Sequence, residues 1–261
     1  MIMMTTDPAD NPQVAQVAEG LWVRVEVDTI GWIDMGEWAV VIDTHESRSI
    51  KDDLFAAIAE TIGDKPVRTV INTHTHYDHV RLNRAFQKKY DSEIVNQKTT
   101  TIPPDGLWID GSKRRLLVQP MVGCHTDKDC VIWLPDCKVL FIGDIFGWGL
   151  INLMGRLTER SARDILAAHD KTMAIGAETI VPGHGPMCTN AELARWVEYF
   201  KWLHGEVLAA MDAGKKDKDI MRDVAPPADM HDWWRFVQWK HEHSVDRMIK
   251  AIRKGWREFP S

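Results

Sequence analysis

The chain has 261 residues, of which 44% are hydrophobic and 27% charged, a composition typical of a globular protein built around one sizeable domain. Its net charge of -6 argues against a surface that binds nucleic acid or an anionic membrane. No apolar run approaches the roughly 18 residues that a membrane span needs. The lack of such a run argues against a membrane-spanning segment, and the negative charge disfavours nucleic acid as a partner. The expected binding partner is therefore a small molecule.

The N-terminus and the cysteines bear on where the protein works. The opening residues, MIMMTTDPADNPQ, contain no basic stretch followed by an apolar core, so no secretory signal is predicted. Four cysteines in a chain of this size do not form a pattern typical of a disulfide scaffold: Cys124, Cys130, Cys137 and Cys188. We therefore expect a reduced, cytoplasmic protein.

After a short polar leader, strand and helix patterns alternate along the first 190 or so residues. β-Branched and aromatic residues predict strands at 21–27, 38–43, 67–72, 92–97, 114–122, 129–135, 138–144 and 178–182. Apolar spacing predicts helices at 49–62, 81–90 and 161–175. Ser49 is expected to cap the first helix, Gly63 and Gly176 to end the first and third, and Gly31 and Gly36 to punctuate a hairpin between the first two strands.

From residue 190 onward the pattern is helical to the end of the chain, with a break at 226–229. The expected organisation is therefore an α/β catalytic domain over residues 1–189, followed by a helical extension over residues 190–261 that packs on the same domain.

The segment INTHTHYDHVRLN, residues 71–83, holds three of the 11 histidines and an aspartate within six residues. In extended chain, residues two apart share a face, so His74 and His76 can bind one ion. Asp78 and His79 lie past the end of the strand, where the chain turns and can face a neighbouring position. Because His and Asp side chains bind transition metals, the segment can supply two ligands to each of two metal sites.

Three further residues of the ligand types, His125, Asp144 and His184, each follow an apolar strand. Glycines stand beside all of them and would let the backbone approach a site closely: Gly123, Gly143, Gly183 and Gly185. A single histidine at a strand end is more often a surface or hydrogen-bonded residue than a metal ligand. The repetition of the pattern, in the loops where α/β sheets build their sites, favours a shared metal centre.

The order HTHYDH, GCH, IGD and PGHG resembles the motif of the metallo-β-lactamase superfamily of αββα hydrolases, over roughly residues 21–186. The resemblance implies an αββα sandwich with a helical C-terminal extension. It implies a first metal held by His74, His76 and His125, and a second held by Asp78, His79 and His184, with Asp144 bridging both. Two zinc ions are expected, with iron or manganese as alternatives. Asp43 matches a position that supports such sites, although a role in its own loop alone is equally open.

The implied chemistry is hydrolysis. Two zinc ions, two carboxylates and a bridging hydroxide sum to a formal charge of about +1, which suits a developing oxyanion. The resemblance implies that a metal-bridging hydroxide attacks an ester, lactone, thioester or related acyl group. We expect Asp78 to handle the proton as the hydroxide is consumed. The aspartate at position 144 points to the glyoxalase II-like branch rather than to the β-lactamases themselves.

Two alternative activities stay open, and one sequence departure bears on the substrate. Persulfide dioxygenases share the fold and bind one iron, and CHTDKDC at 124–130 resembles their third motif, but they usually lose the PGHG pattern found here. A β-lactamase-like lactam hydrolase is the other alternative. Arg81 and Leu82 replace the usual glycine pair; Arg81 either reaches an anionic substrate group or, as we favour, faces solvent.

The aromatic residues and the remaining histidines complete the expectations. Trp148 and Phe146 are expected to line the site entrance. Tryptophans on the C-terminal helices would form core, a wall for an apolar or aromatic substrate, or a homodimer interface: Trp196, Trp202, Trp233, Trp234 and Trp239. Cys124 and Cys130 are interpreted as small packing residues. Six histidines match no ligand position, and of these His169 is expected to be solvated: His45, His169, His204, His231, His241 and His243.

Overall fold

The computed structural model describes residues 12–121 and 123–260, so all but the last two residues of the opening stretch read for a secretory signal lie outside the described residues. The strands are β1 (Gln13–Ala18), β2 (Leu21–Val25), β3 (Ile30–Asp34), β4 (Ala39–Ile42), β5 (Val67–Ile71), β6 (Glu93–Val95), β7 (Leu107–Asp110), β8 (Arg115–Met121), β9 (Asp129–Leu134), β10 (Val139–Gly143) and β11 (Thr179–Pro182). The helices are α1 (Lys51–Ile62), α2 (Tyr77–Val80), α3 (Asn83–Tyr90), α4 (Glu159–Ala174), α5 (Asn190–Asp212), α6 (Asp217–Asp223) and α7 (His241–Arg253), with a 3-10 turn η1 (Ala228–Met230) and a π-helical turn η2 (Phe236–Lys240). None of the helices within these ranges has the length and apolar content to cross a bilayer.

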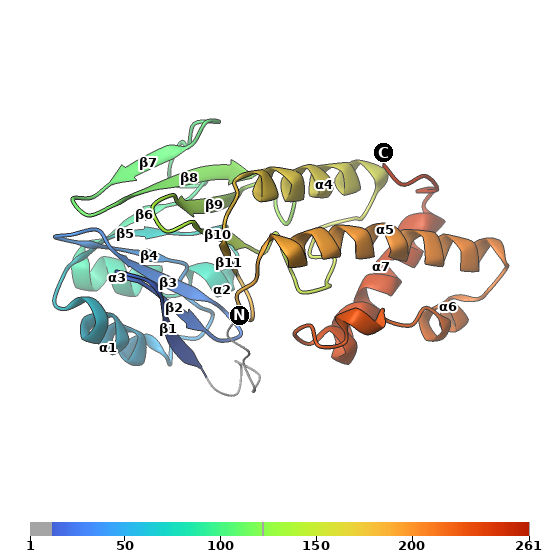
Figure 1. Cartoon of the computed structure of the whole chain (residues 1–261), viewed down its shortest axis with the longest axis horizontal. Coiled ribbons are helices and arrows are strands. Elements are labelled where there is room, and N and C mark those ends of the chain that lie inside the picture. The colour runs from blue at the N-terminus through green and yellow to red at the C-terminus, as the bar shows by residue number, and fades with distance from the viewer. Residues whose placement is uncertain (1–11, 122, 261) are drawn as a thin grey trace.

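Two sheets pack face to face between layers of helices (Figure 1). The first has the strand order β1-β2-β3-β4-β5-β6 and the second β11-β10-β9-β8-β7. Alternate residues of the central strands point into different cores, as the twofold period of a strand requires. In β3, for example, Ile33 belongs to the core between the sheets, whereas Trp32 packs under α1 and α3. The outer face of the second sheet is covered by α4, α5 and α7.

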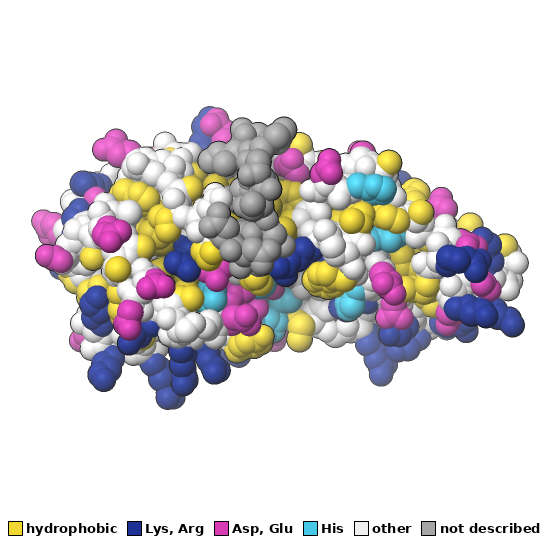
Figure 2. Space-filling view, turned by 90° about the horizontal axis from the view of Figure 1, so that it is seen from below, with side chains coloured by type: hydrophobic (Ala, Val, Ile, Leu, Met, Phe, Trp, Pro, Cys, Tyr) yellow, Lys and Arg dark blue, Asp and Glu magenta, His cyan; other side chains and the backbone are white. Residues whose placement is uncertain are grey.

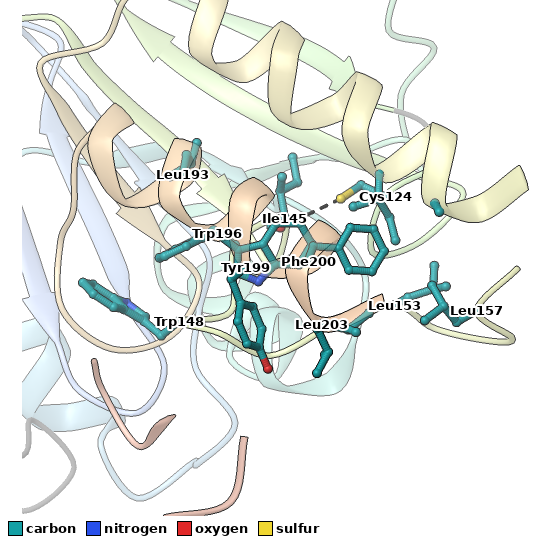
Figure 3. Close-up of a cluster of buried hydrophobic side chains, with 14 of the residues drawn as sticks. Cys124, Ile145, Trp148, Leu153, Leu157, Leu193, Trp196, Tyr199, Phe200 and Leu203 are labelled. Atoms are coloured by element: carbon teal, nitrogen blue, oxygen red, sulfur yellow. Dashed lines mark hydrogen bonds between the residues drawn. The ribbon is translucent and has the colours of Figure 1, made fainter. Parts of the chain in front are cut away.

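The core under α4 and α5 joins the sheet to the C-terminal helices (Figure 3). Leu140 of β10, Trp196 and Phe200 of α5 and Val245 of α7 all belong to this one buried cluster. The break expected at residues 226–229 is present, because α6 ends at Asp223 and η1 follows. The domain boundary at residue 189 stays a prediction, although burial of this kind ties the two parts together.

The predicted hairpin between residues 27 and 38 is wrong, because residues 30–34 form β3, a central strand between β2 and β4. Gly31 lies inside that strand rather than in a turn. A Cβ atom there would lie 2.4 Å from Phe141 Cε1 of the opposite sheet. The glycine thus marks a close approach between the two sheets. The strands β1 and β7, which lie at the sheet edges, were also not predicted, since their residues are half exposed and their apolar pattern is weak.

The helix ends agree with the sequence in part. Gly63 ends α1 with φ 74° and donates its N–H to Ala59 O, as predicted. The cap predicted at Ser49 is wrong: α1 begins at Lys51, and Ser49 instead hydrogen-bonds Ser47. For α4, Thr158 supplies the cap, so the helix begins two residues earlier than predicted.

The expectation that His169 is solvated is also wrong. His169 is fully buried, its Nδ1 lies 3.0 Å from Ile165 O, and its ring stacks on Trp196 with centroids 4.4 Å apart. Burial lowers the pKa of this imidazole to about 4, so it packs as a neutral ring. Its helix pattern alone did not show that α5 would cover this face of α4.

An ion-paired carboxylate at the end of β3 gives the fold a testable pH dependence. Asp34 accepts hydrogen bonds from Lys65 Nζ and Lys113 Nζ, each at 2.6 Å, and from Gly36 N–H at 2.9 Å. Burial alone would raise the pKa of Asp34, but the two lysines outweigh it and lower the pKa to about 2. Since this folded-state pKa lies below the unfolded value, the stabilisation is present above about pH 4 and is lost as the pH falls towards 2.

Asp34→Asn is therefore expected to lower the free energy of unfolding by about 1–2 kcal/mol at pH 7, a range discounted because Lys113 is well exposed. Urea unfolding of both proteins at pH 7 and pH 3 should show this difference shrinking at the lower pH. Asp110→Asn, which removes an exposed pair with Arg115, is the matched control and should change stability by less than about 0.5 kcal/mol. A difference that is the same at both pH values would contradict the role of Asp34.

Candidate metal centre

The seven residues singled out from the sequence come together at one end of the two sheets. His74 and His76 follow β5, and α2 begins at once, so that Asp78 and His79 turn back over the end of the strand. The main chain of His79 is held there, because its carbonyl accepts hydrogen bonds from Asn72 Nδ2 at 2.8 Å and Thr44 N–H at 3.0 Å. Short connections after β8, β10 and β11 supply the other three side chains.

The first set of side chains, here called the three-histidine group, consists of His74, His76, His125 and Asp144. Nδ1 of His76 lies 2.9 Å from Nε2 of both His74 and His125. The proton of His125 belongs on Nδ1, which faces Asn152 O at 3.1 Å. Thr73 donates its hydroxyl proton to Asp43, so the Nδ1 of His74, 3.2 Å from that hydroxyl, carries a proton as well. Both Nε2 lone pairs therefore point at one spot, which is an arrangement suited to a cation.

The second set, here called the Asp78 group, consists of Asp78, His79, His184 and Asp144. Asp78 Oδ2 lies 3.4 Å from His184 Nε2 and 3.6 Å from His79 Nε2. On the face of the molecule drawn in Figure 2, histidine and acidic side chains lie side by side near the middle. His184 and Asp78 are partly exposed, at 23% and 18% of their side chains, whereas His79 is buried.

Asp144 belongs to both groups and turns one oxygen to each. Its Oδ2 lies 3.3 Å from His125 Nε2, and its Oδ1 lies 3.4 Å from His79 Nε2 and 3.3 Å from His184 Nε2. Among the described residues, Asp144 Oδ1 and His79 Nε2 are buried without a hydrogen-bond partner. Buried polar atoms of this kind need an explanation, and a bound cation supplies one. The donor set, five histidines and two carboxylates, fits two first-row transition metal ions.

The two groups differ in the charge that they favour. Burial, reinforced by His79, lowers the pKa of His74 to about 2, and burial also lowers the pKa of His76, so both imidazoles favour the neutral form. For His79 burial acts in the same direction, but the carboxylates of Asp43 and Asp144 outweigh it and raise the pKa to about 10. The same balance, with Asp144 as the main partner, raises the pKa of His184 well above its usual value. The Asp78 group thus attracts positive charge strongly.

Two buried aspartates stand behind the histidines of the Asp78 group. Asp43, whose role was left open, lies 2.8 Å from His79 Nδ1 and also accepts hydrogen bonds from Thr73 N–H and its hydroxyl. It therefore both contacts a candidate metal ligand and orders its loop, in a left-handed backbone conformation with φ 57°. The second, Asp28, lies 3.1 Å from His184 Nδ1 and was missed from the sequence. The sequence contained a signal for Asp28, because this residue directly follows the predicted strand 21–27. Asp43 and Asp144 likewise stand at the ends of predicted strands.

These two aspartates alter the charge expected from the ligands alone. The formal sum of about +1 counted Asp78 and Asp144 but neither Asp28 nor Asp43, which are 2% exposed each. Including both gives a formal charge of about -1 for the same two ions and hydroxide. The buried site as a whole is therefore more negative than the seven ligand-type residues alone indicated.

The side chains at the rim of the site are not the ones expected from the sequence. Phe146 and Trp148 are buried in the core under α4 and α5, where Trp148 packs on Trp233, so the prediction that they line the entrance is wrong. Instead the rim carries Tyr77, next to His76, and Met154, whose N–H donates to His125 O; each is 61% exposed.

The other residues raised by the sequence lie outside the metal centre. Arg81 is exposed, as favoured, and Cys124 and Cys130 are buried packing residues, as expected. All four cysteines are free thiols. Within the described ranges, none of the six remaining histidines joins a candidate metal-binding group.

Comparison with known proteins fits this geometry. Residues 31–119 match the family model described as the metallo-β-lactamase superfamily. The chain is also 32% identical over 139 residues to a hydroxyacylglutathione hydrolase from Brucella anthropi, an alignment that covers 49% of this chain and 52% of that protein. Over residues 31–119 the chain resembles the metallo-β-lactamase superfamily.

Two solved structures share the fold of this chain. A metallo-β-lactamase from Pontibacter korlensis has a TM-score of 0.61 and 19% identity, over 72% of this chain and 98% of that one. A sec-alkylsulfatase from Pseudomonas sp. has a TM-score of 0.71 and 15% identity, over 97% of this chain and 53% of that one. The expected αββα sandwich is thus confirmed. The chain spans about half the length of the curated relatives it matches.

Proposed function

We propose that this chain is a dinuclear metal-dependent hydrolase of esters, lactones, thioesters or related acyl compounds. The observation that carries the proposal is Asp144, which turns one carboxylate oxygen to each of two groups of ligand-type side chains. The name of the related hydroxyacylglutathione hydrolases, which refers to an acyl compound, supports the substrate class.

Each group would hold one divalent ion, with zinc as the proposed metal and iron or manganese as alternatives. His74, His76 and His125 would bind one ion, Asp78, His79 and His184 the other, and Asp144 both. When bound, the two ions supply an activated water and positive charge beside the oxygen on which negative charge develops.

Asp78 is proposed to take up the proton during hydrolysis. Burial raises the pKa of Asp78, but His184 and His79 outweigh it and lower the pKa to about 2, so the carboxylate is ionised at neutral pH. It is also the ligand carboxylate nearer solvent, with 18% of its side chain exposed against 6% for Asp144. An ionised carboxylate at the open side of the site is positioned to accept a proton and release it to water.

The rim supports a small substrate with an apolar part. Tyr77, the first residue of α2, and Met154, in the connection between β10 and α4, flank the three-histidine group, and both are well exposed. Exposed apolar side chains of this size beside a polar centre are typical of ligand-binding surfaces. Tyr77 is held in place by a hydrogen bond from its hydroxyl to Glu46 Oε2 at 3.1 Å.

Elemental analysis of protein produced with zinc and iron both available tests the proposal. We expect two equivalents per chain, mostly zinc, and hydrolysis of p-nitrophenyl esters, lactones or thioesters that a chelator abolishes and zinc restores. Hydrolysis of β-lactams alone would move the substrate class to lactams. One equivalent of iron, with oxygen uptake on persulfide substrates, would replace the hydrolase by a dioxygenase. A folded chain that binds neither metal would contradict both.

A further inference from the structure

The two ligand groups differ in what lies behind their imidazoles. In the three-histidine group, the ring nitrogens of His74 and His125 that face away from the centre meet neutral oxygens. His74 Nδ1 lies 3.2 Å from the Thr73 hydroxyl, and His125 Nδ1 lies 3.1 Å from the Asn152 carbonyl. Neither imidazole of this pair has a carboxylate on its far nitrogen.

In the Asp78 group, both imidazoles have a buried carboxylate behind them. His79 Nδ1 lies 2.8 Å from Asp43 Oδ2, and His184 Nδ1 lies 3.1 Å from Asp28 Oδ1. The side chains of the two aspartates are 4% and 3% exposed, so solvent screens their charge little. A carboxylate on the far nitrogen of a ligand histidine makes the near nitrogen a stronger metal ligand.

Asp28 is fixed in this position by the backbone. Asp28 and His184 form an isolated antiparallel bridge, and Thr29 N–H donates to Gly183 O at 2.8 Å. The other carboxylate oxygen of Asp28 accepts the N–H of Glu46 at 2.9 Å. Val27 O also lies 3.0 Å from His184 Nδ1 and can hold the ring orientation by itself. What Asp28 adds is therefore mainly its negative charge.

The two groups therefore differ in the number of carboxylates in and directly behind them. The three-histidine group contains Asp144 alone, whereas the Asp78 group contains Asp78 and Asp144 with Asp28 and Asp43 directly behind. Asp129 lies near His125, but its carboxylate accepts the backbone N–H groups of His125 and Thr126 and the Thr126 hydroxyl. A divalent cation is thus attracted more strongly to the Asp78 group.

We propose that the Asp78 group binds the first metal equivalent, and that Asp28, acting through His184, is a positioning residue that gives this group its higher affinity. The inference rests on the proposed dinuclear hydrolase, and it concerns the order in which the two sites fill. It assigns to Asp28 a role in metal affinity that does not depend on any substrate.

The test is a titration of metal-free protein with Zn²⁺ against a competing chromophoric chelator, repeated with Co²⁺ to record the absorption bands of each equivalent. Asp28→Asn keeps the shape of the side chain and removes its charge. We expect it to weaken the first equivalent by about 10- to 100-fold and to shift the Co²⁺ bands of that equivalent, with the second equivalent unchanged. Glu26→Gln is the matched control, because Glu26 pairs with Arg24 and His45 near Asp28 but contacts no ligand, and it should leave both equivalents unchanged.

Two further variants assign the order. His76→Ala should keep the tight equivalent, and Asp78→Asn should lose it. The reverse pattern, or an Asp28→Asn protein with wild-type affinity for both equivalents, would overturn the inference. A wild-type chain that binds only one equivalent would contradict the dinuclear hydrolase. In that case the inference about the Asp78 group stands if Asp78→Asn abolishes that equivalent and Asp28→Asn weakens it. Any other result for these two variants would overturn it.

Discussion

Asp144→Asn is expected to reduce the metal content from two equivalents to at most one, and to lower hydrolysis on the order of a thousandfold. The physical reason is that each oxygen of Asp144 serves a different group, at 3.3 Å from His125 Nε2 on one side and 3.3 Å from His184 Nε2 on the other. Asparagine keeps the shape but loses the charge, and one of its two terminal atoms is an NH₂ donor that cannot bind a cation. Elemental analysis and ester hydrolysis at saturating zinc measure the two effects.

The matched control for this variant is Asp136→Asn. Asp136 lies in the turn between β9 and β10, is 42% exposed at its side chain and pairs with Arg114 at 3.3 Å, away from both groups. It should keep two equivalents and full activity. Two equivalents and undiminished hydrolysis in Asp144→Asn would show that this aspartate does not bridge the groups.

Gly183→Ala is expected to disrupt the same centre from the backbone side. A Cβ atom at Gly183 would lie 2.3 Å from Asp144 Oδ1 and 2.9 Å from His79 Cε1, too close for either to remain in place. Because both neighbours are buried, they have no room to move without displacing other groups. We expect hydrolysis to fall by at least about 100-fold and the free energy of unfolding by about 1–3 kcal/mol. Metal titration and urea unfolding measure the loss.

Gly205→Ala provides the comparison for this variant. Gly205 lies inside α5, and a Cβ atom there would meet nothing within 4 Å. Alanine at that position should leave metal binding unchanged and stabilise the protein by about 0.5–1 kcal/mol, because glycine is a poor residue for a helix interior. Wild-type metal affinity in Gly183→Ala would mean that the loop after β11 shifts to accommodate the added methyl group. The close packing around Asp144 would then not be required for metal binding.

Local pattern was enough to predict most of the fold. Strands such as β5 and β10 were found because they are short, apolar and rich in β-branched residues, and Gly63 was found as a helix end because a left-handed cap favours glycine. The edge strands β1 and β7 were not found, because half-exposed residues carry weak periodicity, and the cap predicted at Ser49 was wrong, because α1 begins at Lys51 without a side-chain cap. Gly31 was misread, since a glycine for close approach and a glycine for a turn look alike in a sequence.

The sequence by itself determined the ligand types of the candidate site. Three histidines and an aspartate lie within six residues, and His125, Asp144 and His184 follow at strand ends, which are positions that the ends of sheets bring together. Only the tertiary structure decided how the charge is distributed. Asp28 is 156 residues away from His184 along the chain, and it became visible when the backbone bridge placed its carboxylate 3.1 Å from the imidazole. The physical reason is that ligand types are a property of side chains, whereas the field around them depends on buried groups from distant segments whose positions the packing alone sets.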